Sequence, residues 1–172
     1  YAQTMLGVKN PRIGLLSNGE EEGKGNNLVR NTYPLLAETD LNFIGNVEGK
    51  ELFGGEADVV VTDGFTGNVM LKSTEAVAKL IIDTLKEELM SSFRTKMGAM
   101  LAKPSFGKIK EMLDPSEVGA APLLGIDAMV FVGHGRSDAR AMVSSIRAAK
   151  GSVDNGLLTK LRQTITTSIQ ED

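Results

Sequence analysis

Residues 57–72, ADVVVTDGFTGNVMLK, decide the fold class of this chain. We predict a strand at Ala57–Thr62, whose three valines, Val59–Val61, suit burial on both faces of a sheet. The strand ends at Asp63 and Gly64, and apolar side chains then recur at helical spacing to about Ser92. We expect one face of this helix to be buried, namely Leu71, Val77, Leu80, Ile81, Leu85 and Leu89. A buried strand that leads directly into a helix is typical of a parallel sheet covered by helices.

The same alternation of strand and helix extends outward in both directions. Further strands are predicted at Arg12–Leu16, Leu41–Ile44, Pro122–Ile126 and Ala128–Val132. Further helices are predicted at 1–6, 27–38 with a kink near Pro34, 48–53, 137–150 and 157–169. The order indicates an α/β fold with a mostly parallel sheet. In such a sheet, ligands bind outside the carboxyl ends of the strands.

The segment Phe93–Met112 has a different character, because it is both basic and apolar. We expect Pro104 to divide it into a helical hairpin spanning 90–113. Its apolar side chains include Phe93, Met97, Met100 and Leu101. Apolar residues with a basic flank suit reversible contact with anionic lipid. The alternative is a dimer seam whose basic residues face solvent or an acidic carrier protein.

Composition excludes several classes of function. The chain has 172 residues and a net charge of -3, so it has the length of one domain and no basic field for nucleic acid. It has no cysteine and one histidine, which argues against thiolate or multi-histidine metal sites. No apolar run reaches the length of a membrane span. The chain begins without methionine, in the last turn of a predicted helix, so we expect a fragment of a longer protein.

Three glycine-rich loops follow predicted strands and open predicted helices: Gly19–Asn27, Asp63–Asn68 and Gly133–Ser137. A helix N-terminus offers free backbone N–H groups to a phosphate, and glycine lets the backbone approach it. Lys24, His134 and Arg136 add cations to these loops. Taken singly, each loop could be an ordinary strand-to-helix turn, but we expect all three at the same edge of one sheet, which favours a ligand site. None matches the dinucleotide or P-loop fingerprints, so neither NAD nor ATP is indicated and no cofactor or metal is expected.

Several polar residues in these loops have two interpretations each. Glu20–Glu22 could form a metal or acid/base cluster, but adjacent residues cannot all point to one site, which favours a solvated loop face. His134 lies between two glycines and is either a site residue or a packed side chain satisfied by backbone. Asp63 either orients a cation or holds the Phe65–Asn68 turn.

Three stretches carry a resemblance to a known family: GLLSNGEEEGKGN at 14–26, NFIGNVEGKELFGGEADVVVTDGFTGNVMLK at 42–72 and GAAPLLGIDAMVFVGHGRSDARA at 119–141. They resemble the PlsX phosphate acyltransferases, which start bacterial phospholipid synthesis, over essentially the whole chain. The family's chains are about twice as long, so the resemblance implies that residues 1–172 are the C-terminal part of one α/β domain. It also implies a three-layer α/β/α sandwich similar to phosphotransacetylases and isopropylmalate-type dehydrogenases.

The resemblance implies a homodimer that transfers a long acyl chain from acyl carrier protein to inorganic phosphate. It favours membrane contact and dimerisation together, through projecting hairpins of a peripherally bound cytoplasmic protein. On this basis Lys24 and Asn26 would place phosphate and substrate, and Asp63 would orient Lys24 or its loop. Asn68, with the backbone of Thr66–Asn68, would stabilise the oxyanion. His134 would protonate the leaving sulfur or contact phosphate.

The remaining substrate contacts are expected from the small residues of the same loops: Gly19, Gly25, Gly64, Thr66, Gly67, Gly135 and Ser137. Two rival functions remain open. One is a phosphotransacetylase-like enzyme acting on a soluble CoA thioester. The other is a non-catalytic fragment that dimerises and binds lipid or carrier protein.

Overall fold

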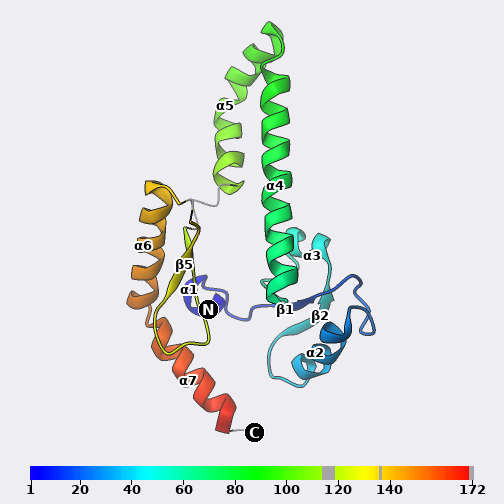
Figure 1. Cartoon of the computed structure of the whole chain (residues 1–172), viewed down its shortest axis with the longest axis vertical. Coiled ribbons are helices and arrows are strands. Elements are labelled where there is room, and N and C mark those ends of the chain that lie inside the picture. The colour runs from blue at the N-terminus through cyan, green and yellow to red at the C-terminus, as the bar shows by residue number, and fades with distance from the viewer. Residues whose placement is uncertain (114–118, 136, 171–172) are drawn as a thin grey trace. The chain divides into compact units, whose positions relative to one another are not determined.

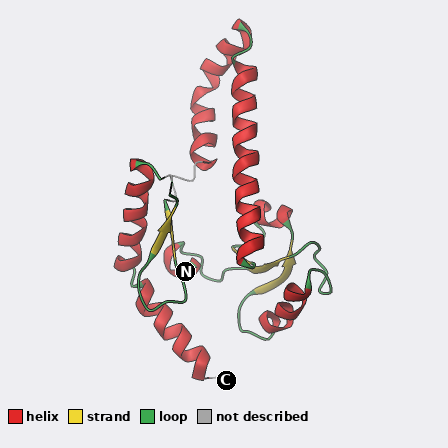
Figure 2. Ribbon diagram, in the orientation of Figure 1, coloured by secondary structure: helices red, strands yellow, loops and turns green. Residues whose placement is uncertain are grey.

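The computed structural model describes residues 1–113, 119–135 and 137–170 (Figure 1). The chain divides into two compact units, Tyr1–Gly67 and Asn68–Asp172. The first contains a three-stranded parallel sheet, and the second is mainly helical with a small antiparallel sheet (Figure 2). The α/β class predicted from the sequence is therefore confirmed, whereas the three-layer sandwich stays a prediction.

The sheet of the first unit is built from strands β1 (Ile13–Leu16), β2 (Phe43–Val47) and β3 (Val59–Val61) in the order β2-β1-β3. Both pairings are parallel, with Leu15 opposite Asn46 on one side and Val61 on the other. Helix α2 (Asn27–Ala37) connects β1 to β2, and α3 (Gly49–Gly54) connects β2 to β3. A short helix, α1 (Ala2–Met5), precedes the sheet. Because all three strands run parallel, their carboxyl ends lie at the same edge of the sheet.

The core of this unit lies on β1 and β2. Ile13, Leu15 and Val47 are buried, and the site of Gly14 is so close to Val47 that an added Cβ would lie 2.5 Å from a methyl carbon. Tyr33 of α2 packs edge-on against Phe43 with ring centroids 5.2 Å apart. These contacts fix α2, and thus the loop that precedes it, against the sheet.

An ion pair joins the other ends of β1 and β3. Arg12 Nε lies 2.9 Å from Asp58 Oδ2, Arg12 Nη2 lies 3.0 Å from Asp58 Oδ1, and the Arg12 backbone N–H also donates to this carboxylate. Hydrogen bonds from the Arg12 side chain and backbone lower the pKa of Asp58 to about 2. The pair therefore ties the starts of the two strands together, at the edge away from the glycine-rich loops.

Two long helices follow: α4 (Gly64–Leu89) and α5 (Phe93–Leu113). The prediction that Pro104 divides the second segment is wrong, because Pro104 lies inside the single helix α5. The chain turns instead at 90–92, where Ser92 Oγ accepts from the Thr95 N–H and Thr95 Oγ1 accepts from the Ser92 N–H. These reciprocal bonds satisfy the free donors of a helix start, so they decide where α5 begins.

The expected buried face of α4 is also not observed, since no residue of this helix is buried. Leu71, Val77, Leu80 and Ile81 are all more than half exposed. The helix itself was predicted correctly, but the described residues do not supply side chains that cover its apolar face. No described helix is both long enough and apolar enough to cross a membrane.

The remainder of the second unit consists of strands β4 (Ala120–Pro122) and β5 (Phe131–Gly133) and helices α6 (Ala139–Asp154) and α7 (Leu157–Gln170). The two strands pair antiparallel, with Ala121 opposite Val132. Strands were predicted at 122–126 and 128–132, so the turn between them was placed wrongly. A parallel connection needs a dozen or more residues, and the link between β4 and β5 is too short for one.

Candidate functional site

The candidate site lies at the carboxyl edge of the β2-β1-β3 sheet. Leu16 is opposite Val47, and the Ser17 N–H donates to Val47 O at 2.9 Å, so β1 and β2 end side by side. β3 runs parallel on the other flank of β1. The loop after β1, the turn after β2 and the turn after β3 therefore leave from one edge, as expected for a ligand site of a parallel sheet.

The loop after β1 is shaped by its own backbone. Gly25 has φ +96°, and its N–H donates to Asn18 Oδ1 at 2.9 Å. Asn26 Oδ1 accepts from the Val29 N–H at 3.0 Å and so caps α2. Gly19 is buried under the Lys24 side chain, where an added Cβ would lie 2.8 Å from Lys24 Cγ. The loop thus presents an exposed lysine beside the start of a helix.

The turn after β3 is held by Asp63. Its Oδ1 accepts from the N–H groups of Phe65 at 2.9 Å and Thr66 at 2.8 Å. Hydrogen bonds from the Thr66 side chain and from backbone N–H groups lower the pKa of Asp63. Among the described residues no ion pair joins Asp63 to Lys24. Asp63 therefore makes the contacts of a turn-holding residue.

The same turn limits which groups could stabilise an oxyanion. The N–H groups of Phe65 and Thr66 donate to the Asp63 carboxylate, and the Gly67 N–H donates to Asp63 O at 2.9 Å. The backbone N–H groups of Thr66 and Gly67 thus have partners within the turn. Gly67 packs closely, with an added Cβ 2.8 Å from Thr62, whereas Gly64 and Asn68 are exposed. The Asn68 side chain is exposed, so its amide stays a candidate donor.

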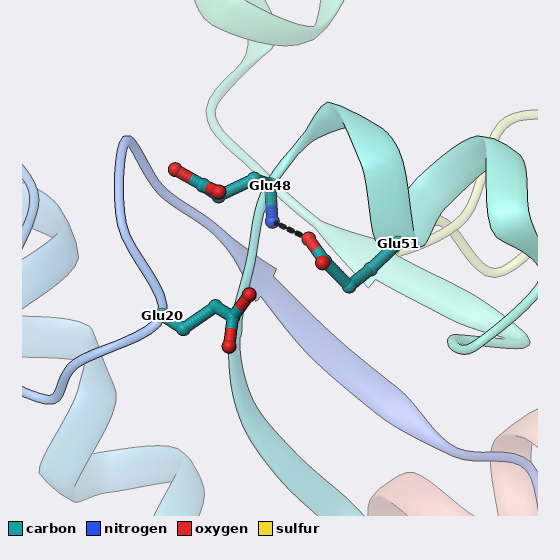
Figure 3. A group of neighbouring side chains, drawn as sticks. All are labelled: Glu20, Glu48 and Glu51. Atoms are coloured by element: carbon teal, nitrogen blue, oxygen red, sulfur yellow. Dashed lines mark hydrogen bonds between the residues drawn. The ribbon is translucent and has the colours of Figure 1, made fainter.

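A cluster of three carboxylates, Glu20, Glu48 and Glu51, lies at the ends of β1 and β2 (Figure 3). Their nearest ligand atoms lie within 4.8 Å of one another, but the Lys50 ammonium lies against all three. Lys50 Nζ lies 2.5 Å from Glu20, 3.1 Å from Glu51 and 3.8 Å from Glu48. The Glu20–Glu22 run is therefore not itself a cluster, since only Glu20 joins this group.

Glu51 is the buried member of the cluster, at 7% exposure. Burial by itself raises its pKa, but the hydrogen bond from the Glu48 N–H and the Lys50 ammonium outweigh burial, so the pKa is lowered. Glu48, Lys50 and Glu51 were not predicted from the sequence as site residues. The available signal was the pair Glu48 and Glu51. Glu48 directly follows a strand and Glu51 comes three residues later, which is the spacing of a capping box at a helix start.

Two buried polar atoms near this edge lack a hydrogen-bond partner in the described part of the chain: Ser17 Oγ and Asn46 Oδ1. They belong to neighbouring strand ends, because Ser17 follows Leu16 and Asn46 precedes Val47 in the paired register. Asn46 Nδ2 is used, donating to Glu21 O at 2.8 Å. Buried polar groups normally have a hydrogen-bond partner, so these two atoms are exceptions at this edge of the sheet.

The third loop follows β5, which belongs to the separate antiparallel sheet. The expectation that all three loops leave one sheet is therefore wrong for Gly133–Ser137. His134 is exposed, its Nε2 lies 3.9 Å from Glu75 Oε1, and its carbonyl accepts from Ser137 Oγ at 2.7 Å. Gly135 is exposed, and Arg136 lies outside the described residues. Joint action of His134 and Asn68 with Lys24 stays a prediction.

The chain matches a known family over most of its length. A sequence profile described as fatty acid synthesis protein matches residues 1–160. The chain belongs to this family. This match and the curated relatives that follow together confirm the resemblance to PlsX phosphate acyltransferases.

Curated relatives carry the name phosphate acyltransferase. The protein from Elusimicrobium minutum is 49% identical over 165 residues, covering 96% of this chain and 48% of its own length. Those from Thermus thermophilus and Aquifex aeolicus are 50% and 45% identical over 95% and 99% of this chain. The chain spans about half the length of these relatives, at 50% and 51% of the latter two.

Proposed function

We propose that a protein carrying this chain transfers a fatty acyl group from acyl carrier protein to inorganic phosphate, giving acyl phosphate for phospholipid synthesis. The observation that carries the proposal is the common edge from which α2 and α4 leave adjacent strands beside Lys24. The start of α2 and the adjacent Lys24 cation suit an anionic substrate. The relatives' name, phosphate acyltransferase, supplies the reaction class.

In the proposed mechanism the chain contributes positioning and charge. Lys24 and the start of α2, capped by Asn26, hold phosphate for attack on the thioester carbonyl carbon. A phosphate oxygen forms the new C–O bond while the Asn68 amide stabilises the oxyanion. The C–S bond then breaks, and His134 protonates the leaving thiolate or contacts phosphate. Direct attack of this kind needs no covalent enzyme intermediate.

A substrate comparison tests this proposal against its two rivals. Acyl-phosphate production is measured with carrier-protein and CoA thioesters, for this chain alone and for a full-length family member in which this sequence replaces the matching half. We expect the full-length protein to use the carrier thioester at least about tenfold better than the CoA thioester, a difference of roughly 1.4 kcal/mol. A preference for CoA would favour the phosphotransacetylase-like enzyme. No product from either protein would favour the non-catalytic rival.

We further propose that the α4–α5 segment serves dimerisation and contact with anionic membrane, which makes this a cytoplasmic protein held peripherally. Phe93 and Leu101 are 79% and 82% exposed, and Met97 and Met100 are also exposed. Apolar side chains this open to water rarely persist uncovered over a large patch. Arg94, Lys96, Lys103 and Lys108 supply the basic flank on the same helix.

Liposome flotation tests the membrane part of this proposal. Vesicles containing anionic lipid should carry the wild type upward, and Met100→Asp with Leu101→Asp should reduce the floated fraction several-fold, because charge is costly in the acyl region. Ile146→Asp, at a site 65% exposed on α6, is the matched control and should float normally. Flotation that is unchanged by the α5 substitutions would eliminate membrane contact through this helix.

A further inference from the structure

The glycine-rich loop is attached to the end of β2 and to α3 by contacts that the proposed mechanism does not use. Asn46 Nδ2 donates to Glu21 O at 2.8 Å, and Lys50 Nζ lies 2.5 Å from Glu20 Oε1. Glu20 and Glu21 lie shortly before Lys24 in the chain, and the Lys24 N–H donates to Glu21 O at 2.9 Å. The position of Lys24 is therefore coupled to these two attachments.

Lys50 is suited to act as the fixed end of this attachment. Its ammonium lies 3.1 Å from Glu51, whose side chain is nearly buried and accepts from the Glu48 N–H at 2.8 Å. Glu51 is thus locked at the start of α3 by the Glu48 N–H (Figure 3). The Lys50 ammonium contacts both Glu51 and the exposed carboxylate of Glu20. Hydrogen bonds and charge from Glu20 and Glu51 raise the pKa of Lys50, so it stays protonated.

We infer that Lys50 is a positioning residue, which clamps Glu20 of the glycine-rich loop to Glu51 of α3 and thereby holds Lys24 where it meets phosphate. The inference rests on the proposed function in one respect, the role of Lys24 toward phosphate. The Lys50 ammonium lies against all three carboxylates, which favours an ion-pair cluster over a metal site.

Two substitutions open the clamp from opposite ends, and a third restores it. Glu20→Gln removes the charge of the Glu20 side chain and leaves the Lys50–Glu51 pair intact, whereas Lys50→Met removes the shared cation. Lys50→Arg keeps a cation that can reach both carboxylates. Lys79→Met is the matched control, since it removes an exposed ion pair with Asp83, 3.7 Å away on α4.

The test uses the full-length family member in which this sequence replaces the matching half. We measure amide hydrogen exchange over Gly23–Gly25 and the affinity for inorganic phosphate. For an exposed pair with one buried partner, we expect both opening variants to exchange about two- to fivefold faster. Phosphate affinity should fall by a similar factor, while turnover at saturating phosphate changes less than about twofold. Lys50→Arg and Lys79→Met should resemble the wild type in all three measurements.

If amide hydrogen exchange over Gly23–Gly25 is unchanged in both Glu20→Gln and Lys50→Met, the proposed clamp is wrong. Faster exchange with unchanged phosphate affinity would overturn the positioning role, because the loop would then be free to move without consequence for the ligand. A wild type that binds phosphate but forms no acyl phosphate would sink the proposed function alone, since the exchange and affinity measurements still decide the clamp.

Discussion

Lys24→Ala is expected to abolish acyl-phosphate formation, with a loss on the order of 100-fold or more, while the melting temperature stays nearly the same. The loss follows from removing a cation that holds the attacking phosphate, an effect comparable to deleting an oxyanion donor. Stability should be spared because the Lys24 side chain is exposed and its backbone N–H bond to Glu21 O does not depend on the side chain. Steady-state kinetics and thermal unfolding of the full-length protein that contains this sequence provide the two measurements.

Two controls separate chemistry from loop shape. Lys24→Arg keeps the charge and should retain more activity than Lys24→Ala, although the guanidinium does not reproduce the geometry of an ammonium. Lys79→Ala removes an exposed lysine from α4 and should leave turnover unchanged. Wild-type turnover in Lys24→Ala would discard the assignment of Lys24.

The parallel sheet could be predicted because its signals are local. The valines of β3, the break at Asp63 and Gly64 and the apolar run after them encode one strand-to-helix unit in consecutive residues. The prediction for the α5 segment was wrong because it took Pro104 as a helix break and overlooked the capping residues Ser92 and Thr95. The reciprocal Ser92–Thr95 bonds fix the start of the helix, and α5 then continues through Pro104.

The candidate site was predictable only where small or polar residues follow strand ends in the sequence. Gly19, Gly25, Asp63 and Gly67 do so, and they occupy the turns at the edge of one sheet. Lys50 was missed because its importance depends on carboxylates from two different elements, which no spacing along the chain reveals. The apolar face of α4 shows the opposite limit: the pattern identifies a face to be covered, but not the partner that covers it.

Gly119→Ala is expected to lower the free energy of unfolding by about 2–5 kcal/mol, the largest stability effect predicted for this chain. Gly119 has φ +76°, a region that costs a residue with a side chain roughly 1–2 kcal/mol. An added Cβ would also lie 2.5 Å from Ser145 N and 2.8 Å from Ala141 O, both in the backbone of α6. Backbone in a helix cannot rotate away as a flexible side chain can, so overpacking adds about 1–3 kcal/mol.

Gly125→Ala is the matched control, because it isolates the conformational part of this cost. Gly125 has φ +87°, but nothing lies within 4 Å of an added Cβ. We therefore expect a loss of roughly 1–2 kcal/mol from conformation alone. Denaturant unfolding followed by circular dichroism measures both variants. Equal losses would mean that α6 does not lie against β4 as closely as the 2.5 Å approach requires.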